Sequence, residues 1–147
     1  MKISELIERY GPWVAATIVT GVYLYFFREY QLPPKVNNLY SSVVTICAVS
    51  IGFLATAKSI LFAVHDSEII RWIKRAGLYD LMINYIMTAI HLCFILAIYS
   101  AIELVFDTSW INVSPSLPFA LWLFLSWVSL LSCYRVIYLL SKILRHQ

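Results

Sequence analysis

Charged residues are scarce in this chain: they make up only 13% of its 147 residues, against 61% that are hydrophobic. A soluble domain usually carries about 25% charged residues. The shortage excludes an ordinary water-soluble globule and a disordered chain, and a content of four glycines excludes a collagen-like repeat. The net charge of +3 is too small to indicate a nucleic-acid partner. The composition instead predicts an integral membrane protein with a single domain.

Cysteines and catalytic motifs are also few. Cys47, Cys93 and Cys133 fall in three different apolar runs and form no C-x-x-C pair, so the sequence indicates neither a disulfide framework nor a zinc site. The chain has no helical Glu-x-x-His motif, no Gly-rich phosphate loop and no nucleophile elbow. We therefore expect a protein that is not an enzyme and that holds no cofactor and no metal.

Long apolar runs dominate what is present. A membrane-spanning helix needs roughly 20 mostly apolar residues. Four runs approach or exceed this length: 12–27, 43–64, 81–106 and 117–140. Backbone groups in hydrocarbon must find their hydrogen bonds within the segment, so these runs should be helices. Short connections then predict an all-α fold, a four-helix up-down bundle that forms one transmembrane domain over residues 1–147.

Basic residues are distributed unequally between the two sides of this predicted bundle. Seven of them lie in the N-terminal segment, the loop between the second and third runs, and the C-terminal tail: Lys2, Arg9, Arg71, Lys74, Arg75, Lys142 and Arg145. The opposite side carries only Arg28 and Lys35. Positive residues accumulate in cytoplasmic loops, so both termini are predicted to be cytoplasmic.

Two stretches on the predicted cytoplasmic side have the pattern of interfacial helices. Residues 3–10 repeat apolar side chains at helical spacing before Gly11 and Pro12. The loop stretch 68–76 separates an apolar arc from a basic arc formed by Arg71, Lys74 and Arg75. The basic arc is either a topology anchor on anionic lipid headgroups or a docking face for an acidic cytoplasmic partner.

The second run carries a seam of small side chains, spaced alternately three and four residues apart. Its members are Thr45, Ala48, Gly52, Ala55 and Ser59. Small seams allow helix backbones to approach closely inside a membrane. The seam predicts a packing face within the bundle, with an inter-subunit or pore-lining face as the alternative.

The third run carries a polar stripe formed by Asn84, Thr88 and His91, with His91 near the middle of the membrane. Polar groups at this depth usually turn toward protein or water. His91 is expected either to bond across the bundle to Ser126 or Ser129 of the fourth run, or to line a pore constriction as a proton-sensitive gate. The same helix offers no Cys, Asp or Glu at liganding spacing, which argues against a metal ligand.

The layout as a whole resembles that of the RexB-like phage-exclusion membrane proteins. The shared features are the size, the four spans, the small-residue second span, the basic inner loop that ends in Arg75-Ala76-Gly77-Leu78-Tyr79, and a short polar tail from Ser141 to Gln147. The likeness is one of architecture and covers most of the chain. It implies a bacterial inner-membrane protein in anti-phage defence that acts as an ion channel and depolarises the membrane.

Two functions follow as hypotheses. The first is a small homo-oligomeric effector that permeabilises or depolarises the membrane, because four helices enclose too little space for a solute path within one chain. The second is a non-conducting anchor or sensor that recruits a soluble cytoplasmic partner encoded in the same operon. Membrane lipids are expected partners in both cases.

Overall fold

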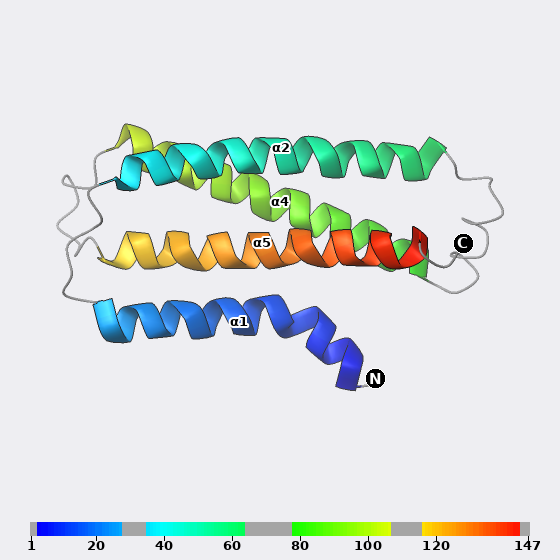
Figure 1. Cartoon of the computed structure of the whole chain (residues 1–147), viewed down its shortest axis with the longest axis horizontal. Helices are drawn as coiled ribbons and strands as arrows, with labels where there is room; N and C mark the ends of the chain where they lie inside the picture. The colour runs from blue at the N-terminus through cyan, green and yellow to red at the C-terminus, as the bar shows by residue number, and fades with distance from the viewer. Residues whose placement is uncertain (1–2, 28–34, 64–77, 107–115, 145–147) are drawn as a thin grey trace.

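The computed structural model describes residues 3–27, 35–63, 78–106 and 116–144, and nearly all of them are helical. The helices are α1 (Ile3–Phe27), α2 (Val36–Ala63), α4 (Leu78–Val105) and α5 (Ser116–Leu144). Successive helices run in opposite directions, so α1 and α4 finish at the same end of the molecule at which α2 and α5 begin (Figure 1).

Three helices are long and apolar enough to cross a membrane: Val36–Ala63, Tyr79–Val105 and Leu117–Ser141. The apolar part of α1, Gly11–Phe26, is shorter. The prediction of an all-helical fold is therefore confirmed, and the last three predicted spans each have a helix long and apolar enough to cross a membrane. A complete crossing by α1 stays a prediction.

The N-terminal stretch differs from the expected separate interfacial helix. Residues 3–10 are the first turns of α1, which continues without a break through Pro12. A proline inside a helix removes one backbone donor and crowds the carbonyl four residues earlier, which bends a helix without necessarily ending it. Figure 1 shows α1 bending away from the other helices in this part. The second predicted interfacial helix, at 68–76, lies outside the described residues.

The helices pack in the spatial order α2, α4, α5, α1. Among the described residues, the extensive helix pairs are α2 with α4, α4 with α5, and α5 with α1. A closed sequential bundle would also pack α1 along α2, and this pair is not one of the extensive contacts. The arrangement therefore places α4 and α5 at the centre, with α1 and α2 on their outer sides (Figure 1).

An aromatic cluster joins all four helices at the end where α2 and α5 begin, which we call the aromatic end. The Phe119 ring lies 5.4 Å from Tyr23 of α1 and 5.5 Å from Trp122, measured between centroids. Trp122 also meets Tyr40 of α2 edge-to-face at 5.2 Å. Its indole Nε1 donates a 2.8 Å hydrogen bond to Ser100 Oγ on α4. Tyr40 lies in the part of α2 that precedes the predicted apolar run, since α2 begins at Val36.

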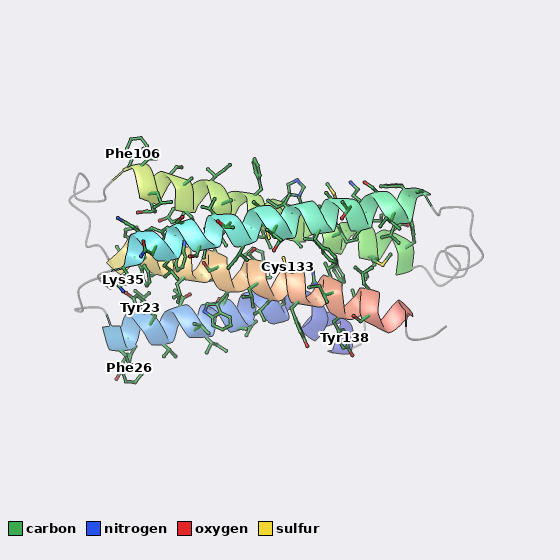
Figure 2. The ribbon with its side chains drawn as sticks, turned by 45° about the horizontal axis from the view of Figure 1, so that its top comes forward. Tyr23, Phe26, Lys35, Phe106, Cys133 and Tyr138 are labelled. Atoms are coloured by element: carbon green, nitrogen blue, oxygen red, sulfur yellow. The ribbon has the colours of Figure 1, made fainter. Side chains whose placement is uncertain are left out.

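Aliphatic packing holds the rest of the bundle together. Leu54, Ile86 and Val136 are almost completely buried where α2, α4 and α5 meet. Ala16 of α1 packs against Val128 of α5 in a separate buried cluster. Side chains that point away from the bundle include Phe26 and Phe106 at the aromatic end (Figure 2). The exterior is thus largely apolar, as expected for a surface that faces lipid.

Candidate functional site

The small seam of α2 faces outward. All five predicted members, Thr45, Ala48, Gly52, Ala55 and Ser59, are exposed. A Cβ atom added at Gly52 would meet no atom within 4 Å. The interpretation of this seam as a packing face within the bundle is therefore wrong for the single chain.

Larger side chains occupy the inward side of α2 instead. Tyr40, Cys47 and Leu54, spaced seven residues apart, are its buried positions. A helical residue advances about 100°, which places the seam roughly 120° around the helix from these positions. Small residues favour close packing in general, but their spacing does not tell whether the close neighbour belongs to the same chain or to another.

The hydroxyl groups of the seam are bonded within their own helix. Thr45 Oγ1 donates to the Ser41 carbonyl at 3.1 Å, and Ser59 Oγ donates to the Ala55 carbonyl at 3.0 Å. These bonds satisfy the hydroxyl donors without any partner outside α2. The seam therefore presents small side chains whose hydroxyl donors are already bonded within α2.

The opposite exposed flank of α2 has a different character. It carries large apolar side chains that are more than half exposed, namely Ile46, Val49, Phe53 and Ile60. Such side chains suit contact with lipid tails. The exposed surface of α2 is thus divided between a flank of large residues and a flank where no seam residue exceeds threonine in size.

The polar stripe of α4 also faces outward. Asn84, Thr88 and His91 are all exposed. Thr88 Oγ1 donates to the Asn84 carbonyl at 2.8 Å, and His91 Nδ1 lies 2.8 Å from the Met87 carbonyl. A carbonyl oxygen only accepts, so His91 Nδ1 donates the proton of this bond.

The expected bond from His91 to Ser126 or Ser129 of α5 is absent from the described contacts, and this prediction is wrong. Ser129 is buried and its hydroxyl lies 3.1 Å from the Cys93 sulfur. His91 and Cys93 are two positions apart, a rotation of about 200°, which places them on opposite sides of α4. Packing thus turns Cys93 toward α5 and leaves His91 outside.

One contact between α2 and α4 lies next to both the seam and the polar stripe. Lys58 of α2 reaches α4, where its Nζ lies 3.0 Å from the Met87 sulfur and 5.7 Å from the centroid of the Phe62 ring. Met87 neighbours Thr88 in sequence and accepts the bond from His91 through its carbonyl. Lys58 and Phe62 flank Ser59, the last residue of the seam. The seam of α2 and the stripe of α4 therefore lie on the same side of the α2–α4 pair.

The basic arc is predicted in the loop between the second and third apolar runs. Its residues, Arg71, Lys74 and Arg75, lie outside the described residues, so their role stays a prediction.

The structure assembles one group of residues that the sequence interpretation missed. Cys47, Cys93 and Cys133 come from three helices and meet in the bundle core, where the Cys93 and Cys133 sulfurs are 3.4 Å apart. A matching depth offered a signal, because Cys47 and Cys93 lie at nearly equal distances from the aromatic ends of their helices. An equal depth in the membrane does not tell whether two cysteines face each other. The packing of the helices determines this.

Comparison with known proteins gives no further guidance on the site. No family model, no curated protein and no solved structure matches this chain. The exposed seam of α2 and the exposed stripe of α4 are therefore the features that indicate a function.

Proposed function

We propose that this protein is a small homo-oligomeric membrane effector that permeabilises or depolarises the bacterial inner membrane. The observation that carries the proposal is the outward position of the α4 stripe, Asn84, Thr88 and His91, on a helix that is apolar enough to span. Lipid tails offer no hydrogen bonds to such groups, so intramembrane polar side chains usually face protein or water. We therefore expect other copies of the chain to cover the exposed polar stripe of α4.

The neighbouring seam favours a second copy of this chain as the occupant. Thr45, Gly52 and Ser59 are small and exposed, so another helix can approach the α2 backbone closely along the seam. Copies that associate through the seam would bring their α4 stripes toward a shared, water-accessible region. Symmetric closure is the usual outcome of such self-association.

The architectural resemblance to RexB-like proteins supports anti-phage defence as the setting. In this proposal both termini are cytoplasmic, and the trigger comes from a partner or from the bilayer. The alternative function is a non-conducting anchor that recruits a soluble cytoplasmic protein. This alternative depends on the basic arc formed by Arg71, Lys74 and Arg75.

Ion flux through liposomes tests the proposal directly. The purified full chain is reconstituted in vesicles that hold a potassium diffusion potential, and the potential is followed with a voltage-sensitive dye. We expect the wild type to dissipate the potential and Asn84→Leu to do so more slowly. Phe94→Leu is the matched control, because Phe94 is an exposed apolar side chain of the same helix. An intact potential in vesicles with confirmed insertion would contradict the effector function.

A pull-down separates the two functions. The full chain is captured in mild detergent from cells that express it with its operon neighbours, both as wild type and with Arg71, Lys74 and Arg75 changed to Glu. A stoichiometric soluble partner that is lost from the variant, together with no ion flux, would favour the anchor. Flux without any such partner would favour the effector.

A further inference from the structure

The three cysteines form a cluster in the middle of the bundle. Cys47 and Cys93 are 3% and 2% exposed, and Cys133 packs against the same buried cluster. Cys93 is the centre of the group: its sulfur lies 3.4 Å from the Cys133 sulfur and 3.1 Å from Ser129 Oγ. Cys47 of α2 belongs to the same buried cluster as Cys93. Figure 2 shows Cys133 in the central part of α5, between the two ends of the bundle.

Thiols that meet in this way can hold a soft metal or form a disulfide. Among the residues that the structure describes, no group of three His, Cys, Asp or Glu side chains is arranged to hold a metal ion. A disulfide is uncharged and carries no hydrogen-bond donor, so the surroundings of Cys93 suit this product better.

We propose that Cys93 and Cys133 are a modification site at which a small uncharged peroxide forms a reversible disulfide between α4 and α5. In the first step Cys93 takes one oxygen from hydrogen peroxide, which yields a sulfenic acid and one water. The Cys133 thiol then attacks the Cys93 sulfur and expels a second water as the S–S bond forms. Two thiols are oxidised by two electrons in total, and one peroxide is reduced to two waters.

The geometry favours this pair over an external partner. A disulfide has an S–S bond of about 2.05 Å, so the 3.4 Å separation must shorten by little more than an ångström. Rotation about the two side chains on neighbouring helices supplies a movement of this size. Cys47 of α2 belongs to the same buried cluster as Cys93 and is therefore available for exchange, in which its thiol attacks Cys93 and releases Cys133. The bond would fix α4 to α5, the two central helices.

Peptide mapping of the oxidised full chain tests this inference. The reduced protein in lipid nanodiscs is treated with hydrogen peroxide, the remaining thiols are alkylated under denaturing conditions, and the digest is analysed by mass spectrometry. We expect a peptide that links Cys93 to Cys133, lighter by two hydrogens than its two parts and separated again by dithiothreitol. A second expected result is a higher unfolding midpoint for the oxidised protein in sodium dodecyl sulfate titration.

Single variants establish which sulfurs react. Cys47→Ala should retain the Cys93–Cys133 link, whereas Cys133→Ala should shift the link to Cys47 and Cys93. Cys93→Ala should abolish every intramolecular link, and Cys93→Ser provides the same information with a polar side chain if the alanine variant folds poorly. Full alkylation of all three cysteines after peroxide would overturn the proposal. Links found only between two chains, or oxidation of single cysteines beyond the sulfenic acid, would overturn it too.

The inference does not depend on the proposed function. The disulfide forms within one chain, so its detection requires neither oligomers nor ion flux.

Discussion

The inward and outward sides of the α2–α4 pair differ in the residues that they present. Inward, the pair contributes Tyr40, Leu54 and Ile86 to a tightly buried core. Outward, it presents the small seam of α2 and the polar stripe of α4, both exposed. The difference shows that the single chain leaves outside, on the seam and the stripe, small and polar residues that a membrane helix normally buries.

We expect the inward side of the α2–α4 pair to govern folding and the outward side to govern association. Substitutions on the inward side should lower the free energy of unfolding of the single chain. Substitutions on the outward side should leave folding intact and change association or ion flux. The expected effects are largest for the aromatic cluster and smallest for the histidine of the outward stripe.

Trp122→Ala should cause the largest loss. Trp122 is buried, packs against Tyr40 and Phe119, and donates its indole hydrogen to Ser100. Truncation of a buried tryptophan costs about 3–5 kcal/mol. Trp127→Ala is the matched control on the same helix, because Trp127 is exposed and should cost under about 1 kcal/mol. Reversible unfolding in mixed micelles measures both, and equal losses would contradict the placement of the core.

Gly52→Leu should disrupt association and leave the fold intact. Gly52 is exposed and a Cβ atom added there meets no atom within 4 Å, so a leucine side chain begins in open space. It would hold a second helix away from the seam, and we expect at least a tenfold weaker association, equivalent to about 1.4 kcal/mol. Energy transfer between labelled copies in liposomes measures this association.

Phe53→Leu is the control for the seam, since Phe53 is the next residue and lies on the opposite flank of α2. Its association should match that of the wild type. If Gly52→Leu and Phe53→Leu associate equally well, the seam does not form the contact between copies.

The sequence predicts the helices better than it predicts their faces. Long apolar runs identify α2, α4 and α5, because hydrocarbon leaves the backbone no alternative to helical hydrogen bonds. Facing direction is harder to predict in a membrane protein, since lipid and protein core are both apolar and the hydrophobic pattern is weak. His91 is an example. Its depth in the membrane is apparent from the sequence, but its side chain faces away from α5 because Cys93 packs against Ser129 of α5.

Residue size misled the sequence interpretation in a similar way. Gly52 and its seam were expected inside the bundle because small residues favour close helix contacts. The chain instead places Tyr40 of α2 against Trp122 of α5, and this large aromatic pair fixes the rotation of α2. Contacts between residues so far apart in sequence leave no local pattern from which to predict them.

Ser129→Ala should have a small but measurable effect. Ser129 is buried and its hydroxyl contacts the Cys93 sulfur across α4 and α5, so its removal should cost about 0.6 kcal/mol, the average for interhelical hydrogen bonds in a membrane protein. Ser59→Ala is the outward control, because the Ser59 hydroxyl bonds only within α2 and should change the free energy of unfolding very little. The same unfolding titration compares them, and a larger loss for Ser59→Ala would reverse the assignment of sides.

His91→Leu should have the smallest effect on folding and a clear effect on ion flux. The His91 ring is exposed and bonds to the Met87 carbonyl of its own helix, so its loss should change the free energy of unfolding by less than about 0.5 kcal/mol. A bridge to α5 would instead cost about 0.6–1.7 kcal/mol, which the unfolding titration resolves. Ile95→Leu is the control, since Ile95 is exposed one turn further along the same side of α4. Unchanged stability with a slower loss of potential in liposomes supports a position of His91 at a shared water-accessible region. Lower stability would contradict its outward placement, and normal flux would remove His91 from the conducting path.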